Sequence, residues 1–205
     1  MGKLSLTTFV TLDGVMQAPG GPEEDRSGGF EYGGWVTPYA DAGMGEYMTE
    51  VFDRVGAFLL GRRTYEIFAG YWPRQTDPSD PIAGRLNGLP KYVASTTLKD
   101  PAWSGTTVLD GEHLQSEIIR VKDGLEGELQ VHGSGALAQW LLARDLVDEL
   151  NLLVFPVFLG TGRRLFPTGS LPTACELTAS RTTQSGIAIH SYRVAGRAEF
   201  GTVGS

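Results

Sequence analysis

Short apolar runs alternate with helical patterns through the middle of this 205-residue chain. Strand-like runs occur at 57–60, 91–95, 106–109 and 129–132. Apolar residues at helical spacing follow the first, third and fourth of these runs. Such alternation is typical of a mostly parallel sheet with helices on both faces. The sequence therefore predicts an α/β fold.

The two ends of the chain extend this pattern. Residues 4–12 alternate apolar side chains with Ser and Thr, which predicts a first strand, and 44–54 has the apolar spacing of a helix. Between them, 13–43 is a glycine-rich and acidic loop, and a loop of this length is usually functional or mobile.

The C-terminal part predicts more strands. Residues 147–158 form an apolar strand region, and two further strands at 175–180 and 187–194 surround a Gln-Ser-Gly turn. This spacing favours an antiparallel hairpin at one edge of the sheet. No stretch has the composition of a linker, so we predict a single domain over residues 1–205.

Composition narrows the function classes. Seventeen basic and 24 acidic residues give a net charge of −7, which argues against a dedicated nucleic-acid surface. A lone cysteine, Cys175, and three scattered histidines leave no disulfide framework and no metal-ligand spacing. No apolar run reaches the length of a membrane span or a signal peptide. We expect a cytoplasmic protein with no metal and no membrane partner.

A first candidate site is the junction Gly61-Arg62-Arg63-Thr64, which follows the run at 57–60. Glycine permits a tight turn, and the helix N-terminus that follows offers free N–H groups and the positive end of the helix dipole. Two adjacent arginines add donors for a phosphate. The alternative is that both arginines are solvated and Thr64 merely caps the helix.

A second candidate is Gly133-Ser134-Gly135-Ala136, which lies between a strand and a helix. With Ala138 it fits the glycine pattern that cradles a pyrophosphate. A standard NAD site would also need an acid about 20 residues further on, and 151–158 contains none. The loop is therefore compatible with a phosphate loop of a different fold.

Two weaker candidates follow other strands. Gly160-Thr161-Gly162-Arg163 is a glycine-rich basic turn, and the polar run Ser95-Thr96-Thr97 lies at the C-terminal end of the strand at 91–95. Ligands of open α/β sheets bind outside the carboxyl ends of the strands, where these segments converge. Each could equally be an ordinary surface turn.

Four motifs occur along the chain in the order Thr11-Leu12-Asp13-Gly14, Leu60-Gly61-Arg62-Arg63-Thr64-Tyr65-Glu66, Gly133-Ser134-Gly135, Pro156-Val157-Phe158-Leu159-Gly160-Thr161-Gly162-Arg163. Together they resemble the dihydrofolate reductase-like family. The similarity is greatest to the C-terminal reductase domain of bifunctional riboflavin-biosynthesis deaminase/reductases. It extends from about Leu4 to Val194.

This resemblance implies a dihydrofolate reductase-like fold and NADPH as cofactor. It places Arg62, Arg63 and Thr64 at the 2′-phosphate or the pyrophosphate, and Ser95 and Thr96 at the 2′-phosphate end. The remaining cofactor-binding residues that it implies are Gly61, Gly133, Ser134, Gly135, Ala136 and Gly160.

On the substrate side, dihydrofolate reductases carry an acid on their first helix, and Glu46 is near that place by its distance before Gly61. We expect it in a pocket walled by Trp35, Tyr47 and Phe155, where partial desolvation would raise its pKa and allow proton relay. The alternative is an ordinary helix acid in water. Asp13 is the second candidate for the proton source.

Trp35 and Phe155 are the expected substrate contacts. Trp35 could stack on a flat ring, although a core or interface position is equally compatible with the sequence. The deaminase zinc motif is missing from the sequence, and the usual Gly-Gly-Gly-Arg motif is replaced by Gly160-Thr161-Gly162-Arg163. The chain is therefore not the bifunctional enzyme, and its substrate is left open.

The resulting hypothesis is an NADPH-dependent reductase, with hydride transfer to a small polar heterocycle of the pterin, folate or pyrimidine type. The partners expected are that small-molecule substrate and a second copy of the chain in a homodimer. The alternative is a non-catalytic NADP(H)-binding or dimer-forming protein that keeps the reductase fold.

Overall fold

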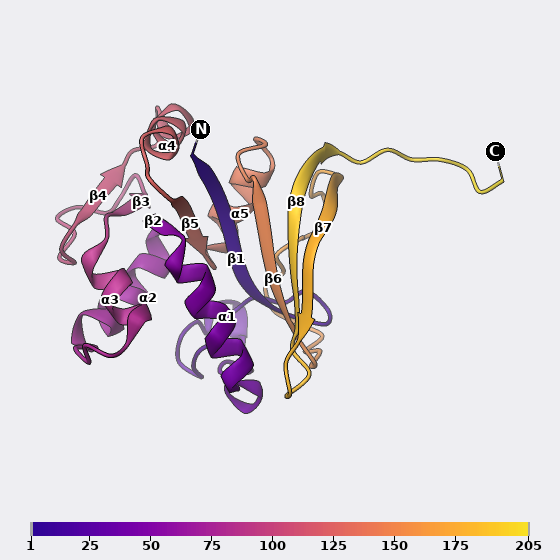
Figure 1. Cartoon of the computed structure of the whole chain (residues 1–205), viewed down its shortest axis with the longest axis horizontal. Coiled ribbons are helices and arrows are strands. Elements are labelled where there is room, and N and C mark those ends of the chain that lie inside the picture. The colour runs from indigo at the N-terminus through magenta and orange to yellow at the C-terminus, as the bar shows by residue number, and fades with distance from the viewer. Residues whose placement is uncertain (1, 205) are drawn as a thin grey trace.

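The computed structural model describes residues 2–204, and its strands form one eight-stranded sheet in the order β4-β3-β2-β5-β1-β6-β8-β7 (Figure 1). The strands are β1 (Lys3–Thr11), β2 (Val55–Gly61), β3 (Lys91–Ala94), β4 (Thr106–Leu109), β5 (Glu128–His132), β6 (Glu149–Phe155), β7 (Thr173–Thr182) and β8 (Ala188–Arg197). Strands β1 to β6 are mutually parallel, while β8 runs antiparallel to both β6 and β7. The predicted parallel sheet with an antiparallel C-terminal hairpin is confirmed.

Helices cover both faces of the sheet, as the sequence predicts. They are α1 (Ala42–Asp53), α2 (Arg62–Tyr71), α3 (Pro81–Gly88), α4 (Leu114–Asp123) and α5 (Gly135–Leu142), with short 3-10 turns η1 (Ser27–Gly29), η2 (Thr37–Tyr39) and η3 (Trp72–Arg74). Buried side chains of α1, α2 and α3 pack in one core, and those of α4 and α5 pack in the other. The helix α3 is an addition to the elements that the sequence predicts.

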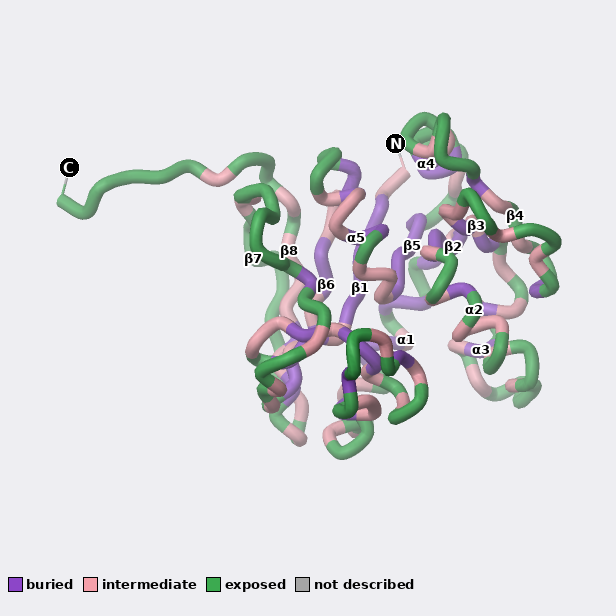
Figure 2. The backbone as a smooth tube through the Cα atoms, turned by 180° about the vertical axis from the view of Figure 1, so that it is seen from behind, coloured by how far each residue is buried: buried purple, intermediate pink, exposed green. Residues whose placement is uncertain are grey.

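The alternation in β1 explains how a single strand contributes to both layers. Leu4, Leu6 and Val10 enter the core beneath α4 and α5. Phe9 packs into the core on the α1 side, and side chains on opposite faces of a strand alternate along it. Figure 2 shows the central strands as the most buried part of the chain.

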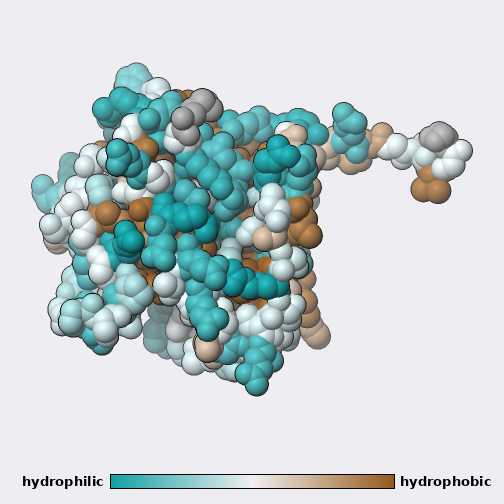
Figure 3. Space-filling view, in the orientation of Figure 1, coloured by the Kyte–Doolittle hydropathy of each residue, from teal (hydrophilic) through white to brown (hydrophobic). Residues whose placement is uncertain are grey.

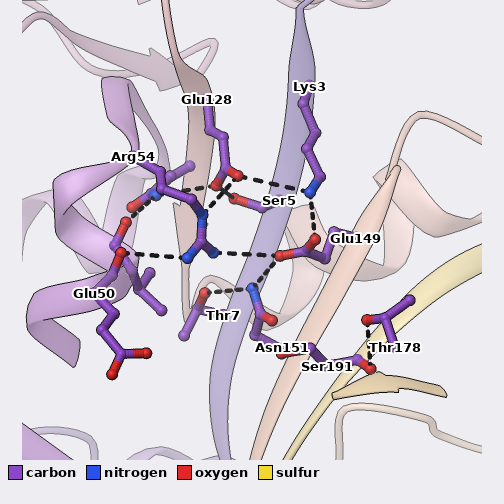
Figure 4. Close-up of polar contacts among 12 residues, drawn as sticks. Lys3, Ser5, Thr7, Glu50, Arg54, Glu128, Glu149, Asn151, Thr178 and Ser191 are labelled. Carbon is purple, nitrogen blue, oxygen red and sulfur yellow. Dashed lines mark hydrogen bonds and ion pairs between the residues drawn. The ribbon is translucent and has the colours of Figure 1, made fainter. Parts of the chain in front are cut away.

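Ion pairs fasten α1 to the amino-terminal edge of the sheet (Figure 4). Arg54, which directly follows α1, donates to Glu128 of β5 over 2.9 Å and to Glu149 of β6 over 3.3 Å. Lys3 of β1 also pairs with both glutamates, and Ser5 donates to Glu128 over 2.8 Å. These charges lie at the starts of three parallel strands, so they stabilise the edge opposite to the one where ligands of such sheets bind.

His132, the last residue of β5, is a buried titratable group in the core. Its ring is buried against Phe52 and Phe58, with Nε2 3.1 Å from Oε1 of Gln130. Burial lowers the pKa of His132 from its ordinary value of 6.5 to about 4, against a weaker opposing effect of Glu128. The neutral ring is therefore the native form.

We expect acid to destabilise the protein through this residue. The unfolded chain binds the proton more readily between the two pKa values, so this stabilisation is complete above pH 6.5 and is lost as the pH falls through about 4. The largest loss is about 3 kcal/mol, since one pKa unit corresponds to about 1.4 kcal/mol. Urea unfolding of the wild type and His132→Phe at several pH values measures it. An equal pH slope in both proteins would contradict this expectation.

The β7-β8 hairpin and the segment after it contain many exposed residues. Most of β7 is exposed, and beyond β8 the chain projects away from the body (Figures 1 and 3). Within the described residues, the helices are too short and polar to cross a membrane.

Candidate functional site

The predicted glycine junctions meet at the carboxyl-terminal edge of the sheet. Because β2 and β5 are parallel neighbours, their ends point the same way, and the amide of Gly61 donates to Oγ of Ser134 over 3.0 Å. Ser134 has a positive φ of 53°, a backbone conformation that is energetically unfavourable for residues other than glycine. The structure thus joins the two candidate phosphate segments by a direct hydrogen bond.

Two helix N-termini face this junction without a capping side chain. Neither α2, which begins at Arg62, nor α5, which begins at Gly135, has a side-chain cap. Asp41 caps α1 and Asp80 caps α3, whereas α4 also has no side-chain cap. What distinguishes α2 and α5 is that both begin at the bonded pair Gly61 and Ser134, so their first N–H groups are available to one anionic ligand.

Arg62 projects from the start of α2 toward the loop after β3. Its guanidinium donates to Oγ1 of Thr97 over 2.6 Å and to Glu66 over 2.7 Å, and about half of its side chain is exposed. Within the predicted polar run 95–97, Ser95 and Thr96 were the expected phosphate contacts, but Ser95 accepts from the amides of Thr97 and Leu98 within its own turn. Thr97 is the residue that contacts Arg62, and only its place in the same polar run could have indicated it.

Arg63 points to a different partner, the loop that follows β1. Its guanidinium forms an ion pair with the buried Asp25, and Arg163 from the loop after β6 pairs with the same carboxylate. Ser27 accepts from Arg163 over 2.5 Å and from Arg63 over 3.3 Å. No pattern in the sequence marked Asp25 or Ser27, and Arg163 was noted only as part of a basic turn.

The loop at 13–43 is folded around the buried Gln17. The side chain of Gln17 donates to the carbonyls of Asp25 and Ser27 over 3.1 and 3.0 Å and accepts from the amide of Arg163 over 3.0 Å. Its own carbonyl accepts from the indole of Trp35 over 2.8 Å. These bonds hold the loop across the ends of β1 and β6.

Asp13 clamps the same two strand ends together. Its carboxylate accepts from Thr11 over 2.5 Å and from the amides of Leu159 and Gly160 over 3.2 and 2.9 Å. Although desolvation would raise its pKa, these hydrogen bonds outweigh it and hold the pKa of Asp13 below its ordinary value. The lowered pKa favours the ionised carboxylate, and in this structure Asp13 serves to join the two strand ends. The backbone amide of Gly160, an expected cofactor contact, donates to Asp13 in this structure.

The expected substrate pocket around Glu46 is filled by aromatic side chains. Trp35 and Phe155 are 6% and 0% exposed and meet edge to face at 5.3 Å between ring centroids. Glu46 itself is exposed on α1, whose buried face comprises Tyr47, Met48, Val51 and Phe52. The expected desolvation of Glu46 is wrong, and neither aromatic ring is open for stacking in this conformation.

The loop Gly133–Ala136 is approached by Met16 from the loop that follows β1. A Cβ built on Gly135 would lie 3.0 Å from the sulfur of Met16, whereas one on Gly133, where φ is +63°, would meet nothing. Gly61 faces Ser134 and Leu137 at ordinary contact distance. An added Cβ at Gly135 would thus meet one flexible side chain, that of Met16.

The residues present fit a dinucleotide with a 2′-phosphate. The uncapped starts of α2 and α5 could each take a phosphate, Arg62 and Thr97 lie side by side at one end, and Gly135 adds no side chain of its own beside Met16 at the start of α5. Thr64 and Ala136 lie in the first turns of these two helices.

Known proteins resemble this chain in sequence or in structure. A protein of Bacillus subtilis (strain 168), YyaP, is 23% identical over 187 residues, covering 90% of this chain and 91% of YyaP. A putative riboflavin biosynthesis protein from Shewanella sp. PV-4 superposes with a TM-score of 0.69 at 18% identity, covering 95% of this chain and 99% of that one.

Dihydrofolate reductase has the same fold. The Enterococcus faecalis enzyme, complexed with NADP(H), superposes with a TM-score of 0.56 at 18% identity, over 97% of this chain and 98% of that one. The RibD C-terminal domain family matches residues 2–189. The fold is therefore dihydrofolate reductase-like, and the chain belongs to the RibD C-terminal domain family.

Proposed function

We propose that the protein is an NADPH-dependent reductase that transfers a hydride to a small polar heterocycle of the pterin, folate or pyrimidine type. The observation that carries the proposal is the joined pair of uncapped helix N-termini, linked by the bond from Gly61 to Ser134. Membership of a reductase-domain family and the dihydrofolate reductase-like fold support it.

Each residue at the carboxyl edge has a proposed part in holding the cofactor. Arg62, together with Thr97, binds the 2′-phosphate, because a guanidinium beside a hydroxyl offers directional donors to phosphate oxygens. Gly133, Ser134 and Gly135 place the first amides of α5 at the pyrophosphate. When bound, NADPH supplies the hydride, and the protein contributes orientation and exclusion of water.

The substrate enters where the loop at 13–43 closes over the sheet. Trp35, Tyr39 and Phe155 fill that region through edge-to-face contacts. We propose that a flat ring packs against this cluster when the loop moves, since aromatic rings stabilise one another in edge-to-face and offset-stacked arrangements. Asp13 acts as a positioning residue that fixes the ends of β1 and β6.

The test is NADPH consumption, followed by absorbance, with oxidised pterins, dihydrofolate and aminopyrimidines offered as substrates. The proposal predicts turnover with at least one class. Tight NADPH binding without consumption across all of them would favour the alternative of a non-catalytic NADP(H)-binding protein.

We propose that water supplies the proton, and this gives a prediction for Glu46. Because Glu46 is exposed, Glu46→Gln is expected to change turnover by less than about twofold, whereas loss of a general acid costs about 10²-fold or more. Steady-state kinetics of the variant with the identified substrate measures this. A hundredfold loss of kcat with unchanged NADPH affinity would restore Glu46 as the proton donor.

A further inference from the structure

Asp25 is a carboxylate enclosed by two guanidinium groups from distant parts of the chain. It is 5% exposed, while the side chains of Arg63 and Arg163 are 53% and 52% exposed. One carboxylate oxygen also accepts from the amide and the hydroxyl of Ser27 over 3.0 and 2.7 Å. The arginines are therefore accessible from solvent although the anion that they hold is not.

The charges of this cluster do not balance. Two guanidinium groups face one carboxylate, and within residues 2–204 neither arginine forms an ion pair with a second acid. One positive charge is left without a partner. A group with more charge and more acceptor oxygens than a carboxylate would satisfy both arginines better, and a phosphate is such a group.

The cluster lies beside the candidate cofactor site. Arg63 belongs to the first turn of α2, whose N-terminus has no side-chain cap. Arg163 comes from the turn after β6, and its amide is held by Gln17, which also binds the carbonyl of Asp25. A change at Asp25 is thereby connected to the position of the whole loop.

We propose that Arg63 and Arg163 form a phosphate-binding site that Asp25 occupies from within the chain. A phosphate-bearing ligand and the closed loop then compete for the same two guanidinium groups, and binding of the ligand releases the loop. The inference rests on the proposed function only in that Arg63 lies in the first turn of α2, whose N-terminus is part of the proposed cofactor site. It adds Arg163 to the phosphate-binding residues and identifies the ion pairs of Asp25 as the contact that holds the loop closed.

Asp25→Asn tests the competition, because it keeps the size of the side chain and removes its charge. Titration calorimetry with inorganic pyrophosphate at matched salt should show about tenfold tighter binding than in the wild type, the effect of one charge-assisted contact. Glu23→Gln is the control, since it removes the same charge from the same loop but contacts only Arg26. It should leave the affinity unchanged.

The double variant Asp25→Asn/Arg163→Gln tests whether Arg163 is responsible for the tighter pyrophosphate binding. We expect it to lose the tighter binding, because one of the two guanidinium groups is gone. Unchanged or weaker pyrophosphate binding in Asp25→Asn would overturn the proposal, as would a gain that survives removal of Arg163.

The wild-type protein provides a measurement that does not depend on any variant. Saturating pyrophosphate should accelerate hydrogen exchange at the loop amides of Ser27 and Gly34, which are bonded within the closed loop. Slower exchange there would overturn the proposal. If the protein turns over NADPH but shows neither the tighter pyrophosphate binding nor the faster exchange, the reductase proposal stands and this site is rejected. If both effects occur without turnover, this site stands and the reductase proposal is rejected.

Discussion

Replacing Arg62 by Gln is expected to weaken NADPH binding by about 10- to 150-fold, the value of one charge-assisted contact of about 1.5–3 kcal/mol. NADH lacks the 2′-phosphate, so its affinity should change little. The wild type should consequently prefer NADPH to NADH by a similar factor. Calorimetry with both cofactors, at one salt concentration, measures the two ratios.

The fold should tolerate this substitution. Arg62 is half-exposed, and its bonds go to Glu66 on the same helix and to Thr97; exposed pairs of this kind contribute less than about 1 kcal/mol. Arg193→Gln is a matched control, because Arg193 is an exposed arginine paired with Glu176 on the hairpin. Equal losses for NADH and NADPH in Arg62→Gln would place the guanidinium away from the 2′-phosphate.

Local patterns predicted most of the fold. Strand 106–109 and helix 114–123 agree with β4 and α4 at both ends, because apolar periodicity is a local property of the sequence. The helix α3 was missed since Gly84 and Gly88 weaken its pattern. Its start was nevertheless marked by Asp80, which caps the helix, followed by a proline at the first helical position.

The site was predictable only where its residues are close in sequence. Gly61 to Thr64 and Gly133 to Ala136 were found because a strand, a glycine and a helix follow one another. Asp25 could not be found in this way, since its arginine partners lie 38 residues away at Arg63 and still further at Arg163. Contacts of this length depend on the register of the sheet and the path of the loop.

Glu46 shows the opposite case, in which a local pattern was available. The apolar spacing of the first helix already assigns Tyr47, Met48, Val51 and Phe52 to its buried face, and a residue directly before Tyr47 lies about 100° away from it around the helix. The family's acid was assigned to Glu46 by distance along the chain. Helical periodicity would have placed it in solvent.

Gly135→Val should abolish measurable cofactor binding, with a loss of about 100-fold or more for NADP⁺. A Cβ at this position would lie 3.0 Å from the sulfur of Met16, and the two methyl groups of valine would stand over the first amides of α5. A phosphate that accepts from these amides would lose two charge-assisted hydrogen bonds of about 1.5–3 kcal/mol each. Calorimetry with NADP⁺ measures the loss.

Further variants separate a blocked site from a damaged fold and from a displaced Met16. The sulfur of Met16 belongs to a flexible side chain, so Gly135→Val should fold, with a thermal midpoint within a few degrees of the wild type. Gly84→Val on α3, where a Cβ would meet nothing, is the matched control and should bind normally. If displaced Met16 were the only obstacle, Gly135→Val/Met16→Ala would recover binding. We expect no recovery, because the methyl groups themselves occupy the approach to α5. Normal NADP⁺ binding by a folded Gly135→Val protein would contradict the prediction and place the pyrophosphate away from this loop.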